Sequence, residues 1–332
     1  MKKDSFRKFA DLLKNNRHMV IVTHWNPDGD AIGSSLALYH FLKLKGRNVS
    51  LIVPNSYPDF LHWMPGQSQI LNFDLDEAKC LTRIRKAEVV FNLDFNSYKR
   101  LEKLGHVLSQ TTALKVLIDH HRQPEIKPDL SFHDIEATST CELVYDLIIG
   151  LKGRKLISKS IAACLYTGLM TDTGSFKFAV VNSKTHLVIA DLLKTGIKPH
   201  TIHGAVYDNY SAHRLRLFGY ALSEKLVLVD PYPVAYFCLR SDELRRFDFQ
   251  KGDTEGLVNY PFMIKGIQVC ALFQEAGDHV KISFRSKGKI DVNTFARSYF
   301  NGGGHLNAAG GRSHESIEET ERRFVELVKS LF

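Results

Sequence analysis

The stretch MVIVTHWNPDGDAIGSSLAL, residues 19–38, decides how the fold begins. Its first five residues are apolar or β-branched, which is typical of a buried strand, and its last eight favour a helix. His24, Asp28 and Asp30 lie in or beside the loop between them. Because a strand that leads directly into a helix is the first half of a β-α-β unit, the stretch predicts a parallel sheet.

The same alternation continues through residues 1–196. Further short β-branched runs predict strands at residues 48–53, 88–93 and 114–118. Helical patterns occur at residues 31–45, 98–104, 139–149 and 158–170. Because the strands are continuously apolar, both faces of the sheet should be covered, as in a Rossmann-like α/β domain.

A smaller second domain is predicted beyond a helical linker. Residues 197–225 contain Pro199 and Gly204 and favour one or two polar helices. Four runs in residues 226–332 are spaced closely enough for antiparallel strands: 226–229, 234–239, 268–273 and 280–284. Two helices are expected at residues 291–300 and 317–331. The expected fold is therefore an α/β domain plus a smaller α+β domain, with a cleft between them.

The composition limits the class of protein. The 332 residues include 44 Lys and Arg against 36 Asp and Glu, a formal net charge of +8, and 44% are hydrophobic. These values are typical of a globular chain and exclude a collagen-like or disordered one. Five cysteines without CxxC spacing predict reduced thiols and a cytoplasmic protein. Without an apolar leader or a long apolar run, no membrane association is expected.

Acidic and histidine side chains follow the ends of several predicted elements. Together with the three in the first loop they number seven: His24, Asp28, Asp30, Asp94, Asp119, His120 and His121, with Asp172 after a helix as an eighth. Each alone could be a turn or cap residue. Because the carboxyl ends of parallel strands open into one crevice, we expect them to converge.

A cluster of this kind favours divalent cations. Neighbouring carboxylates repel one another unless positive charge is placed between them. Mixed Asp and His ligands favour a first-row ion such as Mn²⁺, with Mg²⁺ as the alternative. Two ions about 3.5–4 Å apart can clamp the attacking and leaving oxygens of a phosphoryl transfer. The sequence therefore predicts a two-metal site that acts on a phosphoester.

A glycine-rich stretch near the end, NGGGHLNAAGG at residues 301–311, is the second informative segment. Its backbone N–H groups could bind an anion, above all if a helix begins at Leu306, or it could be only a flexible loop. Residues 281–312 contain six Lys or Arg and one acid. Arg285 among them could bind a terminal phosphate through two parallel hydrogen bonds.

The motifs and their order resemble a known family. THWNPDGDAIGS, NLDFNS, LIDHH and GLMTDTGSF resemble the four motifs of the DHH phosphoesterase superfamily, and GGGHLNAAGG resembles the signature of its associated C-terminal domain. The compact two-domain form is most similar to the NrnA-like branch, bifunctional oligoribonucleases and 3′-phosphoadenosine-5′-phosphate (pAp) phosphatases. The resemblance implies a Mn-dependent hydrolase that converts short RNA oligomers to mononucleotides and pAp to AMP.

The resemblance also implies roles for individual residues. The ligands of two Mn²⁺ ions would be His24, Asp28, Asp30, Asp94, His120 and Asp172, with Asp94 bridging. Asp119 would orient a histidine, and His121 would face the scissile phosphate and protonate the leaving oxygen. The pocket for the distal phosphate would consist of Arg285, Gly303, Gly304 and His305.

These assignments lead to a mechanistic hypothesis. A hydroxide bridging the two ions attacks phosphorus, and the separation of the metal site from the Arg285 pocket favours very short nucleotides. Two alternatives stay open: a phosphodiesterase acting on cyclic di-AMP or linear pApA, and a non-catalytic RNA-binding module that kept the fold. A homodimer is compatible with the prediction, and the polarity on longer chains is left open.

Overall fold

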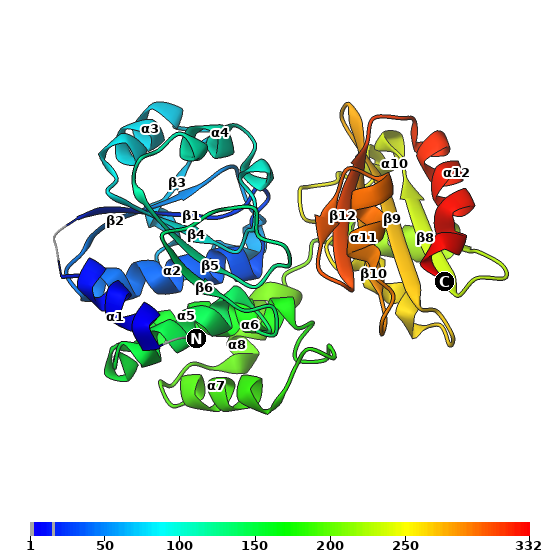
Figure 1. Cartoon of the computed structure of the whole chain (residues 1–332). Helices are drawn as coiled ribbons and strands as arrows, with labels where there is room; N and C mark the ends of the chain where they lie inside the picture. Colours follow the sequence, from blue (N-terminus) through cyan, green and yellow to red (C-terminus); the bar gives the residue numbers. More distant parts are fainter. Residues whose placement is uncertain (1–2, 15–16) are drawn as a thin grey trace. The chain divides into compact units, whose positions relative to one another are not determined.

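The computed structural model describes residues 3–14 and 17–332, and the chain divides into two compact units, Met1–Asn209 and Tyr210–Phe332 (Figure 1). The division lies between two helices, α8 (Pro199–Tyr207) and α9 (Ala212–Glu224). The sequence predicts one or two helices in this part of the chain, and the structure has two.

The N-terminal unit contains a parallel sheet of six strands in the order β3-β2-β1-β4-β5-β6. The strands are β1 His18–Val22, β2 Asn48–Val53, β3 Ile70–Asn72, β4 Val89–Leu93, β5 Leu114–Asp119 and β6 Leu130–His133. The other helices are α1 Lys3–Leu12, α2 Gly29–Leu44, α3 Glu77–Lys86, α4 Lys103–Ser109, α5 Thr140–Gly150, α6 Lys159–Asp172 and α7 Ser183–Leu193. Single turns of 3₁₀ helix lie at Asp59–Leu61, Gln67–Gln69, Tyr98–Leu101 and Arg154–Leu156. The predicted Rossmann-like α/β architecture is confirmed.

Helices cover both faces of this sheet. On one face Met19 and Ile21 of β1 pack in the cluster that includes α1, α2, α5 and α6, and on the other Val20 and Val22 pack with α3 and α4. This explains why the run MVIV is apolar throughout instead of alternating with polar residues. Since all six strands run in the same direction, the loops that leave their carboxyl ends lie along one edge.

Helices α2 and α6 approach each other closely because glycines of α2 face α6. A Cβ atom on Gly29 would lie 2.3 Å from the Oγ1 of Thr171, and one on Gly33 would lie 2.6 Å from the carbonyl oxygen of Cys164. Real Cβ atoms do not come this close to other atoms. The contact holds the start of α2 against the end of α6, and both helix ends carry predicted site residues.

The C-terminal unit contains a second six-stranded sheet, in the order β11-β12-β10-β9-β8-β7. Its strands are β7 Leu226–Leu228, β8 Val234–Leu239, β9 Val269–Ala276, β10 His279–Ser286, β11 Gly303–Gly304 and β12 Ala308–Ser313. Besides α9 it has α10 Ser241–Arg246, α11 Val292–Tyr299, α12 Ile317–Leu327 and 3₁₀ helices at Leu257–Met263 and Val328–Leu331. One face packs on α11 and α12, the other on α9, α10 and the first 3₁₀ helix.

One expectation for this unit is wrong, and the helix that would have favoured anion binding by the glycine-rich stretch is not formed. Strands β8 and β9 pair in parallel, so the sheet is mixed rather than wholly antiparallel. No helix begins at Leu306; the backbone N–H of His305 donates to the carbonyl of Ala308 at 2.7 Å, and β12 follows. The small residues AAGGRS of β12 carry no strand pattern of their own, and their pairing with β10 supplies the structure.

The close contact of α2 and α6 can be tested by Gly33→Ala. The added methyl group meets the carbonyl of Cys164, so the variant should lose about 1–3 kcal/mol of unfolding free energy. Gly204→Ala is the matched control, because its nearest neighbour in the same unit is 3.9 Å away, and it should gain roughly 0.5–1 kcal/mol. Chemical denaturation measures both; equal stability of the two variants would contradict the packing argument.

Candidate metal and phosphate-transfer site

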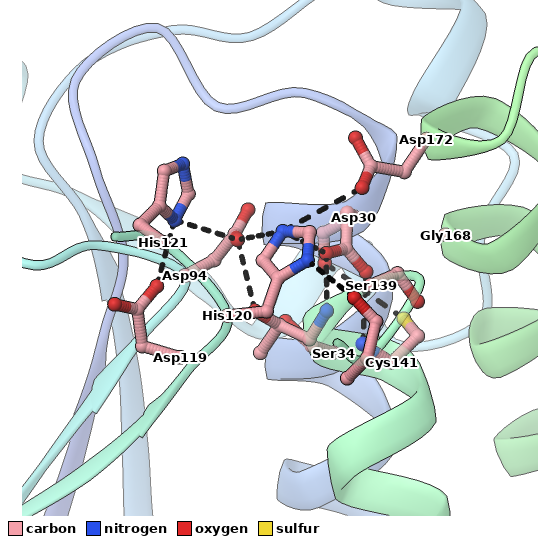
Figure 2. A network of polar contacts seen from close by, with 12 residues as sticks. Asp30, Ser34, Asp94, Asp119, His120, His121, Ser139, Cys141, Gly168 and Asp172 are labelled. Atoms are coloured by element: carbon pink, nitrogen blue, oxygen red, sulfur yellow. Dashed lines mark hydrogen bonds and ion pairs between the residues drawn. The ribbon is translucent and has the colours of Figure 1, made fainter. Parts of the chain in front are cut away.

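The predicted Asp and His residues of the N-terminal unit meet at the carboxyl edge of its sheet. Figure 2 shows the part of this cluster around Asp94 and His120. His24 follows β1, Asp94 follows β4, Asp119 ends β5, and Asp172 is the last residue of α6. The remaining members lie at the start of α2 and directly after β5: Asp28, Asp30, His120 and His121. Residues distant in sequence are brought together because each follows a parallel strand or borders the α2–α6 contact.

His24, Asp28 and Asp94 form a first group of facing ligand atoms. The Nε2 of His24 lies 3.8 Å from the Oδ2 of Asp28 and 3.5 Å from the Oδ2 of Asp94. Its Nδ1 donates to the carbonyl of Trp25 at 2.8 Å, which leaves the lone pair of a neutral ring on Nε2, facing the carboxylates. Asp28 also caps α2 by accepting from two backbone N–H groups.

Asp30, His120 and Asp172 form a second group. The Nε2 of His120 lies 3.8 Å from the Oδ2 of Asp30 and 3.5 Å from the Oδ2 of Asp172. The Nδ1 of His120 donates to the carbonyl of Ala137 at 3.1 Å. As at His24, a backbone carbonyl fixes the ring so that Nε2 points into the cluster.

Asp94 lies between the two groups. Its Oδ2 faces His24, whereas its Oδ1 lies 3.6 Å from the Nε2 of His120. The side chain is 3% exposed, so these oxygens have little access to water. Its backbone φ of 64° is in the left-handed region, which Asp tolerates better than most residues. One carboxylate thus presents an oxygen to each group, the arrangement that a bridging ligand needs.

The charges of the cluster are poorly balanced by protein atoms alone. Burial and the neighbouring carboxylates of Asp94 and Asp172 raise the pKa of Asp30 well above its usual value. At His120 burial opposes the charged form, but Asp172, Asp94 and Asp30 outweigh it and raise the pKa to about 9. At His24 contacts with Asp94 and Asp28 likewise outweigh burial and raise the pKa. Mutual repulsion of this kind is what divalent cations relieve, and the two donor sets fit such ions.

Asp119 and His121 form a separate buried pair beside Asp94. The Nδ1 of His121 donates to the Oδ1 of Asp119 at 2.7 Å, and Arg100 donates to its Nε2 at 2.8 Å. Because a guanidinium can only donate, His121 is neutral and carries its proton on Nδ1. Burial, together with the Arg100 charge, holds the pKa of His121 well below its usual value. The Oδ2 of Asp119 is buried without a hydrogen-bond partner among the described residues.

Three residues at the site escape the sequence analysis: Arg100, Thr140 and Cys141. The backbone N–H groups of Thr140 and Cys141, at the start of α5, donate to the two carboxylate oxygens of Asp30 at 2.6 and 2.9 Å. The hydroxyl of Thr140 donates to the Oδ1 of Asp94 at 2.9 Å. The predicted start of a helix at residue 139 is the signal from which these two backbone donors could have been found, because the N-terminus of a helix binds anions. For Arg100 the sequence offers no such signal.

The predicted phosphate-pocket residues lie in the C-terminal unit, on neighbouring strands. Arg285 of β10 pairs with Ala308 of β12, and Gly303 and Gly304 form β11 beside it. His305 follows β11 in the turn that leads to β12. Arg285 also lines a small cavity with Lys281 and Ser283, so three polar side chains of one strand face the same space.

Comparisons with known proteins identify the family. The description "DHH family, N-terminal domain" matches residues 18–169, and "DHHA1 domain" matches residues 232–332. A crystal structure of an exopolyphosphatase-related protein from Bacteroides fragilis is 40% identical, with 99% of this chain and 96% of that chain covered and a TM-score of 0.93. The chain belongs to the DHH family. It is thus a hydrolase, as the sequence predicts.

Two further relatives extend the comparison. The "Bifunctional oligoribonuclease and PAP phosphatase NrnA" of Bacillus subtilis is 28% identical over 314 residues, 93% of each chain. RecJ of Thermus thermophilus, solved in complex with Mn²⁺, shares the fold at 13% identity, with a TM-score of 0.57 over 99% of this chain and 55% of that one. In residues 3–14 and 17–332 no helix is long and apolar enough to span a membrane.

The role of Thr140 can be tested by Thr140→Val, which removes the hydroxyl bound to Asp94 while the backbone N–H bound to Asp30 stays. We expect Asp94 to bind a cation, and loss of a group that orients a metal ligand typically costs 10–100-fold in metal affinity, so the Val variant should lose affinity in this range. Calorimetric titration with Mn²⁺ measures it. Thr140→Ser keeps the hydroxyl and should bind Mn²⁺ like the wild type. Unchanged Mn²⁺ affinity in the Val variant would contradict the role of Thr140 in orienting Asp94.

Proposed function

We propose that this DHH-family chain is a divalent-cation-dependent phosphoesterase that hydrolyses short oligoribonucleotides to mononucleotides and pAp to AMP. The main support is the position of Asp94, which presents one oxygen to His24 and the other to His120. The names given to its relative in Bacillus subtilis support the choice of substrates. The five cysteines are free and buried, which suits a reducing compartment such as the cytoplasm.

The proposed ligands divide as the two groups do. His24, Asp28 and Asp94 would hold one cation; Asp30, Asp94, His120 and Asp172 would hold the other. Imidazole among the donors favours Mn²⁺ over Mg²⁺. Bound there, two divalent cations supply a nucleophile at neutral pH and neutralise charge on the phosphoryl oxygens.

The chain's own residues would orient the substrate and move the proton. His121 is held by Asp119 on one side and contacts Arg100 on the other. To protonate a leaving oxygen, His121 must gain a proton at Nε2, where it now accepts from Arg100. We propose that a substrate phosphate draws the Arg100 guanidinium away, which frees Nε2 and removes the charge that, next to burial, lowers the pKa of His121.

We assign substrate capture to the C-terminal part of the chain. Residues 1–196 would be the catalytic domain, residues 197–225 the linker and residues 226–332 the substrate-binding domain. Arg285, Gly303, Gly304 and His305 would hold the distal phosphate or terminal nucleotide. A guanidinium suits a terminal phosphate because it can donate two parallel hydrogen bonds.

The metal assignment can be tested by Asp94→Ala. Removing the shared ligand should lower Mn²⁺-dependent hydrolysis of a dinucleotide by more than about 100-fold and reduce bound Mn²⁺ in the purified protein. Turnover assays and elemental analysis measure the two effects. Asp59→Ala is the control, since its side chain is 97% exposed and it should leave both unchanged. Retained turnover in Asp94→Ala would reject the assignment.

The substrate-capture role can be tested by Arg285→Ala. We expect KM for di- and trinucleotides to rise at least about tenfold, whereas hydrolysis of a small generic phosphodiester should change little, because only the longer substrate reaches the pocket. Arg322→Ala, at an exposed position of α12, is the matched control. An equal loss on both substrates would reject the role.

A panel of pAp, RNA of 2–24 nucleotides, cyclic di-AMP, pApA and polyphosphate would define the preferred substrate.

A further inference from the structure

The loop between α6 and α7, residues 173–182, is tightly held at its start. Thr173 is fully buried, and its carbonyl accepts from the backbone N–H groups of Lys177 and Phe178 at 3.0 and 3.1 Å. Its hydroxyl accepts from the backbone N–H of Phe176 at 3.0 Å. One buried residue therefore fixes the path of the next five, directly after the proposed ligand Asp172.

The backbone of this loop adopts a costly conformation. Gly174, Ser175 and Phe176 have φ values of 56°, 62° and 64°, all in the left-handed region. For a bulky residue such as Phe this region is unfavourable. The turn directs Phe176 inward, where its ring lies 5.6 Å from that of Tyr166 between centroids. Such a conformation persists only because the contacts of Thr173 and Phe176 hold it.

The second aromatic residue of the loop points outward. The ring of Phe178 lies directly over Gly174, since a Cβ there would be 2.4 Å from its Cζ. Phe178 is nevertheless 38% exposed, although burial of a ring is normally favourable. The ammonium of Lys177 lies 6.0 Å from its ring centroid. The loop thus presents an aromatic surface with a cation beside it.

This surface lies close to the proposed metal ligands. Asp172 ends α6 with its carboxylate turned toward His120, and the loop continues from that point (Figure 2). Gly174, on which the ring of Phe178 lies, is two residues further along. Two residues of chain span at most about 7 Å between Cα atoms, so Gly174 and the ring that lies on it are near the end of α6 that carries Asp172. A nucleotide whose phosphate lies at the cluster can place its base in this region.

We propose that Phe178 is a stacking surface for a nucleobase of the substrate and that Lys177 contacts an adjoining phosphate. The proposal rests on the proposed function of the metal cluster and narrows it to substrates that carry a base. Aromatic rings bind bases of any sequence through their faces, and a neighbouring cation adds attraction for the backbone. Inorganic polyphosphate has no group that could use the ring, so Phe178 would separate nucleotide from polyphosphate substrates.

The test compares Phe178→Ala, Phe178→Trp and Leu187→Ala, the last a control because Leu187 is 70% exposed on α7. Binding of a non-hydrolysable phosphorothioate dinucleotide is measured beside KM, so the result does not depend on turnover. Two analogues, each lacking one base, and inorganic tripolyphosphate complete the set. Phe178→Ala should weaken dinucleotide binding at least about fivefold, with Trp restoring it and Leu187→Ala unchanged.

The base-free analogues distinguish stacking from support of the loop. Wild type and Phe178→Ala should bind the analogue that lacks the stacked base with equal affinity, as in a double-mutant cycle. Tripolyphosphate should also be unaffected. Equal loss on all ligands, or no loss on the dinucleotide, would overturn the proposal. A metal cluster without a catalytic role would give a different result. No phosphoester would then be hydrolysed, but the difference in dinucleotide binding between wild type and Phe178→Ala would persist.

Discussion

The crowding of Asp30, Asp94 and Asp172 at one edge of the sheet is the constraint on which the N-terminal unit depends. Such charges are not stable together unless positive groups surround them. The start of α5 supplies two backbone N–H groups to Asp30 and a hydroxyl to Asp94. His24 and His120 complete the shell, each fixed by a carbonyl at its other nitrogen. The folded chain therefore presents two groups of donor atoms that could hold cations.

The sequence predicts this site because residues that can bind metal directly follow the ends of predicted strands. Apolar runs identify β1, β4 and β5, and parallel topology then brings the following residues together. Short edge strands such as β3 and β6 escape prediction, because three or four residues carry too little pattern and their pairing with a neighbour decides their structure. Arg100 escapes for a similar reason, since only the folded chain places it against His121.

The comparisons separate catalysis from specificity. A relative named as an oligoribonuclease and a solved structure described as exopolyphosphatase-related are both similar to nearly the whole chain. In the function we propose, the ligand cluster would act on phosphorus and its oxygens, which oligoribonucleotides and polyphosphate have in common. Discrimination must therefore come from residues that contact the rest of the substrate. The loop after α6 and the β10–β12 region are the parts of this chain that we assign to that role.

Gly29 has a different role from that of the two acids beside it, Asp28 and Asp30. The acids are chemical groups, whereas Gly29 is there because α6 leaves no room for a side chain: its Cβ would overlap Thr171. A larger residue at position 29 becomes tolerable only when position 171 loses its side chain. The two positions, far apart in sequence, are therefore coupled by packing: a side chain at position 29 requires a smaller residue at position 171.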